Sequence, residues 1–313
     1  MIEIAAASKM PVGESLEIMK QRISPATVTG KEKVISIVTG THGDELEGQY
    51  VCYELNRRLQ NERHLLKGFV DIYPALNPLG IDSITRGFPN FDLDMNRIFP
   101  GNKDGSLAEY IASEIIDSLK DSDLCIDIHA SNIYLREAPQ VRISENVREE
   151  LVPYAKKLNV DYIWVHGAST VLESTLAHSL NSIGVPTLVV EMGVGMRITK
   201  EYGDQLITGI LNLMKSMGMY EGETEPVRKP YISEKDEEVA FINAQVPGVF
   251  LPEVSHWRLI EEGSLVGEIV NPLTGQTEEE ILSPCDGILF TLREYPVVNE
   301  GSLIARILRR KVK

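Results

Sequence analysis

The chain has 313 residues, enough for one large domain and one smaller one, and its 43% hydrophobic content is ordinary for a globular protein. A formal net charge of −15 argues against nucleic acid as a partner, and three scattered cysteines argue against a disulfide framework. The chain shows no signal-peptide pattern and no apolar run long enough for a bilayer, so we expect a cytoplasmic protein without a membrane partner.

Strand and helix patterns alternate over the first two thirds of the chain. Short β-branched, apolar runs predict buried strands at 34–38, 70–73, 124–128, 162–165 and 187–190. Amphipathic segments between them predict helices at 46–59, 107–119, 147–158, 172–183 and 200–217. This alternation predicts an α/β fold, a largely parallel sheet with helices on both faces.

The loop after the first predicted strand carries His42 and Glu45. Such strand-to-helix loops lie at the edge where open α/β sheets bind ligands. An imidazole and a carboxylate offered together suit a zinc ion, which in catalytic sites has a third protein ligand and an open position. We therefore interpret this pair as half of a metal site.

The connection 73–101 is long and rich in Pro, Gly and Asn, which is typical of a functional loop. Within it, Asn96 and Arg97 offer several donors to a carboxylate, and Arg86 is a candidate for polarising a scissile carbonyl. A loop held together by Asp–Arg pairs is the alternative explanation for at least one of these arginines.

Two histidines end predicted strands and compete as the third ligand: His129 and His166. A lone histidine at a strand end is more often a hydrogen-bonded loop residue than a ligand. The His42 and Glu45 pair favours His129 as the ligand, because its strand is expected to end at the sheet edge that carries His42. Asp127 lies two residues earlier on the same strand face, so it could orient His129, although it could equally bond a backbone amide.

Glu191 comes directly after an apolar strand, which places a carboxylate at the same sheet edge. Metal-assisted hydrolysis needs a base that takes a proton from water and returns it to the leaving amine, and Glu191 suits that role. A structural salt bridge would explain it equally well. Arg142, which follows the third ligand in the chain, is a candidate for lining the substrate pocket.

A polar segment at 221–226 predicts a linker, and the pattern beyond it changes to short strands and turns. We predict an α/β catalytic domain at 1–221 and an all-β barrel-sandwich domain at 222–313. The second region contains an internal repeat, in which 247–250 is similar to 286–290 and 262–266 is similar to 300–304. Two such half-barrels would pair into one small β-sandwich.

This region resembles the barrels of biotinyl and lipoyl carrier domains, but its hairpin at 271–280 lacks the carrier lysine. We therefore expect a structural role, or a gate over the active site.

Together, the motifs resemble the succinylglutamate desuccinylase/aspartoacylase family of the zinc carboxypeptidase clan over roughly residues 30–310. The motifs that carry this resemblance are Gly40-Thr41-His42-Gly43-Asp44-Glu45, Asp94-Met95-Asn96-Arg97-Ile98-Phe99-Pro100-Gly101, Asp127-Ile128-His129 and Val190-Glu191-Met192-Gly193. The resemblance implies a mixed, zinc-carboxypeptidase-like sheet. It also implies one Zn²⁺ per chain, held by His42, Glu45 and His129.

The family further implies Glu191 as base and proton shuttle, and the wider clan implies Asp94 as the partner of a ligand histidine. The resemblance also implies that Asn96 and Arg97 bind the carboxylate of the substrate, and that Arg86 helps to stabilise the oxyanion. The expected reaction is hydrolysis of the amide bond of an N-acyl amino acid or a similar small amide. A metallocarboxypeptidase or isopeptidase of the same clan is the main alternative, and a non-catalytic binding protein is the third. Because relatives commonly form dimers or higher oligomers, the resemblance also admits a homo-oligomer.

Overall fold

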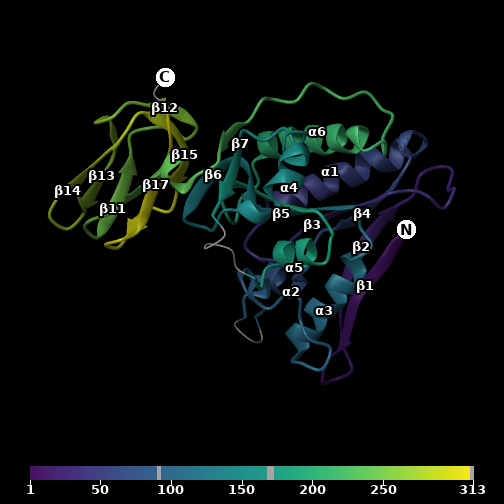
Figure 1. Cartoon of the computed structure of the whole chain (residues 1–313). Coiled ribbons are helices and arrows are strands. Elements are labelled where there is room, and N and C mark those ends of the chain that lie inside the picture. The colour runs from purple at the N-terminus through teal and green to yellow at the C-terminus, as the bar shows by residue number, and fades with distance from the viewer. Residues whose placement is uncertain (90–92, 168–172, 311–313) are drawn as a thin grey trace.

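The computed structural model describes residues 1–89, 93–167 and 173–310 (Figure 1). Its larger part is built on a twisted sheet with the strand order β1-β2-β4-β3-β5-β8-β6, continued by β7 and β9 beside β6. The strands are β1 (Ile2–Lys9), β2 (Ser15–Ile23), β3 (Val34–Thr39), β4 (Phe69–Tyr73), β5 (Leu124–Ala130), β6 (Leu135–Ser144), β7 (Tyr162–His166), β8 (Thr187–Gly193) and β9 (Tyr231–Ser233).

The sheet is mixed and largely parallel, as predicted. Its centre, β4-β3-β5-β8, is parallel, and these strands are apolar because both of their faces are covered. By contrast, β6 runs antiparallel to β8, and β7 runs parallel to β6. The edge at which β3, β5 and β8 end is therefore the one where β6 begins.

Helices cover both faces of this sheet (Figure 1). On one face, α1 (Glu47–Asn61), α4 (Arg148–Ala155) and α6 (Lys200–Ser216) bury residues such as Leu55 and Ile210 against the strands. On the other face, α2 (Pro78–Ser83), α3 (Leu107–Leu119) and α5 (Leu176–Ser182) pack residues such as Ile111 and Leu180. Short 3₁₀ turns lie at Arg63–Leu65, Met95–Arg97, Glu145–Val147 and Asp236–Glu238. Across the described ranges, no helix is long and apolar enough to cross a membrane.

A smaller all-β domain follows, at one end of the molecule (Figure 1). Its strands are β10 (Val239–Asn243), β11 (Gly248–Pro252), β12 (Arg258–Ile260), β13 (Leu265–Asn271), β14 (Gln276–Leu282), β15 (Gly287–Arg293), β16 (Val297–Val298) and β17 (Leu303–Arg309). The predicted repeat is visible in the pairing, because β11 pairs antiparallel with β13 just as β15 pairs with β17. Residues such as Phe250 and Ile307 form the core of this domain.

The two parts share one hydrogen-bonded sheet. The first residues of β6 pair with β15, so the order continues β6-β15-β17-β10 into the second domain. After residue 222, β9 still pairs with β7 of the main sheet. The boundary between 1–221 and 222–313 therefore stays a prediction.

Some elements differ from the sequence-based expectation. The β1–β2 hairpin and β6 were not predicted, and the loop 73–101 contains α2. The predicted helix 172–183 is found as Leu176–Ser182, and its predicted first residue, Leu172, lies outside the described residues, as do residues 90–92 of the long loop.

Candidate metal centre and active site

The loop between β3 and α1 carries His42 and Glu45, which are 3% and 4% exposed. Gly43 lies so close to α2 that a Cβ there would be 2.0 Å from the carbonyl carbon of Gly80. Only glycine allows this approach, and the Gly43 amide also donates to the carbonyl of Arg86 at 3.2 Å. The loop is thus held between the sheet edge and α2, with both side chains directed inward.

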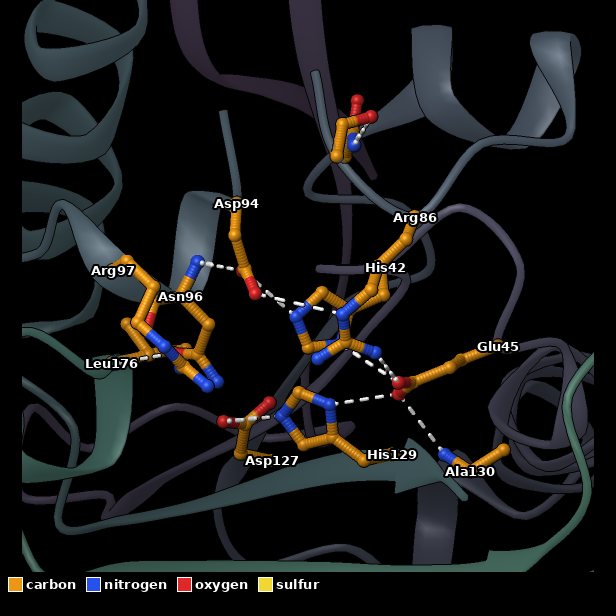
Figure 2. A network of polar contacts seen from close by, with 12 residues as sticks. His42, Glu45, Arg86, Asp94, Asn96, Arg97, Asp127, His129, Ala130 and Leu176 are labelled. Atoms are coloured by element: carbon orange, nitrogen blue, oxygen red, sulfur yellow. Dashed lines mark hydrogen bonds and ion pairs between the residues drawn. The ribbon is translucent and has the colours of Figure 1, made fainter. Parts of the chain in front are cut away.

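His42, Glu45 and His129 form one compact group at the ends of β3 and β5 (Figure 2). Glu45 Oε1 lies 2.8 Å from Nδ1 of His42, and Glu45 Oε2 lies 2.9 Å from Nδ1 of His129. One ligand atom from each residue falls within 4.8 Å of the other two. Two imidazole nitrogens and a carboxylate oxygen at this spacing fit a zinc ion with one open position.

The outer nitrogen of each histidine contacts a different carboxylate. Nε2 of His42 lies 2.9 Å from Oδ1 of Asp94, and Nε2 of His129 lies 3.1 Å from Oδ2 of Asp127 (Figure 2). Such contacts set the tautomer and orientation of a metal-binding histidine. Burial lowers the pKa of His129, but Asp127 and Glu45 outweigh it and raise that pKa well above its usual value. The same histidines outweigh burial at Glu45 and lower the pKa of its carboxyl.

The competing histidine, His166, lies elsewhere. It ends β7, which runs opposite to β5 and β8, and it pairs with Ser144 at the far end of β6. Because β6 reverses the direction of the sheet, β7 ends at the opposite edge from β5 and β8. The structure brings His129, and not His166, beside His42 and Glu45.

A cavity of about 370 Å³ opens over this group, on the face of the sheet that α3 and α5 cover. It runs from the three candidate ligands toward Thr187 and His166. Among the described residues, its lining comes only from the stretch between His42 and Glu191. The described residues of the all-β domain contribute none of that lining.

Glu191 lies next to His129 in the β5–β8 pairing and lines the same cavity. Its side chain is 15% exposed. Removal from water raises the pKa of Glu191 to about 7, although the neighbouring Arg142 opposes this shift. Nη1 of Arg142 lies 3.3 Å from Oε1 of Glu191, and its Nη2 donates to Oε2 of Glu137 at 2.6 Å.

The predicted substrate-binding residues also line the cavity. Asn96 accepts a hydrogen bond from the backbone amide of Leu176 at 2.8 Å through Oδ1, which leaves its NH₂ group to donate (Figure 2). Arg97 donates from Nη1 to the carbonyl of Asn96 at 2.7 Å. Arg86 is 40% exposed and donates from Nη1 to Oε1 of Glu45 at 2.8 Å.

Sequence reasoning missed the buried Glu137, which holds Arg142, and the far end of the cavity, where His178 and Thr187 lie. Thr187 had a usable signal, because it shares a strand face with Glu191 at even spacing. Glu137 had a weaker one, because the strand that carries it contains a proline and several charged residues.

Residues 31–217 match the model of the succinylglutamate desuccinylase/aspartoacylase catalytic domain. The chain belongs to this family. The resemblance seen in its motifs is thereby confirmed, and the mixed α/β sheet with a small C-terminal sheet domain is also the architecture of its structural neighbours.

Among curated proteins, the chain is 26% identical to the N-alpha-acetyl-L-2,4-diaminobutyric acid deacetylase of Halomonas elongata, over 96% of this chain and 89% of that protein. Its fold is similar to that of the product-bound ectoine utilization protein EutE (DoeB) from Ruegeria pomeroyi, with a TM-score of 0.83, 19% identity, and coverage of 97% and 93%. A succinylglutamate desuccinylase/aspartoacylase from Rhodobacter sphaeroides matches with a TM-score of 0.81, 24% identity, and coverage of 100% and 96%.

Proposed function

We propose that this protein is a zinc-dependent hydrolase that cleaves the amide bond of an N-acyl amino acid or a similar small amide with a carboxylate. One observation carries the proposal: three candidate ligand atoms lie within 4.8 Å of one another in a cavity that Glu191 also lines. Membership of a deacylase family supports the hydrolysis of an amide. Zinc, the substrate and the role of each residue are the parts that we propose.

One zinc ion per chain would be held by His42, Glu45 and His129, with Asp94 and Asp127 orienting the two imidazoles. Zinc at such a site polarises a scissile carbonyl and makes water more acidic. The burial of all three ligands supports this assignment, since it removes competing water from the donor atoms.

Glu191 would act as the base that takes a proton from the attacking water and then donates it to the leaving amine. A carboxyl with a pKa of about 7 suits both steps near neutral pH. Arg86, half-exposed beside Glu45, would donate to the oxygen that becomes negative during attack.

Asn96 and Arg97 would bind the carboxylate of the substrate, because they present an amide and a guanidinium side by side to the cavity. We predicted Arg142 as a third substrate-binding residue. In the structure, two carboxylates already engage it, so we propose that its main role is to hold Glu191.

The direct test is metal analysis of the purified protein followed by a hydrolysis screen. N-α-acetyl-L-2,4-diaminobutyric acid is the first substrate to test, because the curated relative is named for its deacetylation. N-acetylaspartate, N-succinylglutamate and a panel of short peptides complete the screen. We expect zinc near one equivalent per chain and turnover of at least one N-acyl amino acid.

Turnover of peptides alone would instead identify a metallocarboxypeptidase or an isopeptidase. Binding of these amides without any turnover would identify a non-catalytic binding protein.

We also propose a cytoplasmic location. Cys52, Cys125 and Cys285 are all buried free thiols, which is typical of proteins that fold in a reducing compartment. Fractionation of cells that express the chain from its own gene tests this point.

A further inference from the structure

The candidate base is connected to the C-terminal domain by a row of charged side chains, of which Glu137 is buried and the others are partly buried. Arg142 lies between two carboxylates, Glu191 at 3.3 Å and Glu137 at 2.6 Å. Glu137 is 1% exposed and accepts a second guanidinium, Nη1 of Arg306, at 2.6 Å. The signs therefore alternate from Glu191 to Arg306, and each carboxylate in the row has a cation beside it.

Strand register explains how Arg306 reaches Glu137. Glu137 on β6 pairs with Thr291 on β15, and Thr291 pairs in turn with Arg306 on β17. The three residues form one row across the shared sheet, and a threonine in the middle is short enough for the arginine to extend over it. The C-terminal domain thus supplies Arg306 as the second cation beside Glu137.

An aromatic ring fixes both guanidinium groups. The ring centroid of Trp164 lies 5.7 Å from Cζ of Arg142 and 5.7 Å from Cζ of Arg306. Phe241 lies 5.6 Å from Cζ of Arg306. Cations in this position are attracted to the ring face, so the aromatic rings help to hold both guanidinium groups beside Glu137.

Arg142 contacts two carboxylates, Glu137 and Glu191. How strongly Glu137 attracts Arg142 determines how close Arg142 stays to Glu191. Glu137 is almost fully buried and also accepts a hydrogen bond from Nε2 of Gln140, a neutral donor. Without Arg306, Arg142 would be the one cation of this row left beside Glu137, so the buried charge would attract it more strongly. Arg142 would then leave the partly exposed Glu191. With Arg306 in place, Glu137 is neutralised from both sides and Arg142 can contact Glu191.

We propose that Arg306 is a positioning residue for the candidate base: by neutralising Glu137, it keeps Arg142 against Glu191. The inference rests on the proposed role of Glu191. It gives the C-terminal domain a part in catalysis even though this domain does not line the cavity.

The test uses the full-length zinc-loaded protein and the N-acyl amino acid that the wild type hydrolyses best. For Arg306→Met we expect kcat to fall about tenfold while KM changes less than about threefold and zinc content stays the same. Arg306→Lys keeps the charge and should retain most of kcat. Glu294→Gln is the matched control, because Glu294 contacts Arg136 of β6 across the same two domains but touches neither Arg142 nor Glu191.

A double-mutant cycle separates positioning from general stability. In a Glu137→Gln background the buried charge is gone, so adding Arg306→Met should change kcat by less than about twofold. The inference is overturned if Arg306→Met lowers kcat by the same factor in both backgrounds. It is also overturned if Arg306→Met has the kcat of the wild type, or if Glu294→Gln lowers kcat as much as Arg306→Met does. If R306M does not fold, the test compares kcat of E137Q with kcat of the double variant R306M/E137Q. A lower kcat in the double variant overturns the inference.

A crystal structure of each variant gives a result that does not depend on turnover. We expect the separation of Arg142 Nη1 and Glu191 Oε1 to lengthen in R306M and to stay near 3.3 Å in the wild type. An unchanged separation contradicts the inference. If the wild type hydrolyses no amide but the separation lengthens as expected, the proposed function fails and the positioning by Arg306 holds.

Discussion

Oδ2 of Asp127 lies 3.1 Å from Nε2 of His129, two residues further along the same face of β5. The opposite nitrogen of this imidazole faces Glu45, so a single strand supplies both a candidate ligand and the group that orients it. Asp94 contacts the outer nitrogen of His42 in the same way, but it lies on a different loop from that histidine.

Replacing either orienting carboxylate should weaken zinc binding without abolishing it. For Asp127→Asn and Asp94→Asn we expect zinc affinity to fall about 10- to 100-fold, because the amide no longer fixes the tautomer of the ligand histidine. Titration against a chelator of known affinity measures this. Glu54→Gln, an acid-to-amide change in a surface pair with Arg57, should leave zinc affinity as it is. Equal affinity in all three variants contradicts the assignment.

Replacing the third ligand should remove the metal. We expect His129→Ala to contain little zinc and to be inactive, because a site with two protein ligands binds zinc weakly. His166→Ala is the comparison, since this histidine lines the far end of the cavity. Zinc per chain, measured after dialysis, decides. Full zinc in His129→Ala with loss in His166→Ala would reverse the ligand assignment.

Removing the base should separate chemistry from metal binding. For Glu191→Gln we expect the zinc content of the wild type and a fall in kcat of about 10²- to 10⁴-fold, because water loses the group that takes its proton. Metal analysis and steady-state kinetics on the same preparation measure both quantities. A variant that retains most of its turnover shows that another group is the base.

Removing Arg142 should change the pH dependence of turnover. Removal from water raises the pKa of Glu191 to about 7, and the charge of Arg142 opposes that rise. The base works ionised, so kcat/KM falls as the pH drops below this pKa. In Arg142→Met the pKa rises further, and we expect the acidic limb of the profile to move to higher pH. A shift to lower pH, or none, contradicts the contact with Glu191.

Removing Arg97 should affect substrate binding more than chemistry. In Arg97→Met we expect KM to rise about 10- to 100-fold, the range for a lost hydrogen bond to a charged group, with a smaller change in kcat. Arg57→Met, on the exposed face of α1, should leave KM unchanged. The same kinetics with a substrate amide that lacks the carboxylate should show little difference between wild type and Arg97→Met.

The central strands and the candidate ligand set could be predicted because their signals are local. Apolar runs mark β3, β5 and β8, and the polar residues that follow them meet at one edge in any parallel arrangement. The even spacing of Asp127 and His129 likewise places both side chains on one face of their strand. Asp94 could be named only through the resemblance, because nothing in its local pattern distinguishes it from Asp92.

The rest depends on strand direction and on contacts distant in sequence. Pro139 and the charged residues of β6 hide a strand whose polar side chains find their partners on one another and on strands distant in sequence. Because β6 runs antiparallel to β8, His166 at the end of β7 lies away from the three candidate ligands. No local sequence pattern indicates the direction in which a strand runs in the sheet. The contact between Arg306 and Glu137 joins residues 169 positions apart, so it exists only once β15 has paired with β6.

The pairing of β6 with β15 has a consequence for how the molecule unfolds. Detaching the C-terminal part would break a run of backbone hydrogen bonds and leave part of β6 as an open strand edge prone to association. The two regions should therefore melt together in a single calorimetric transition. A shortened chain that ends near residue 222 should aggregate instead of forming a free-standing enzyme.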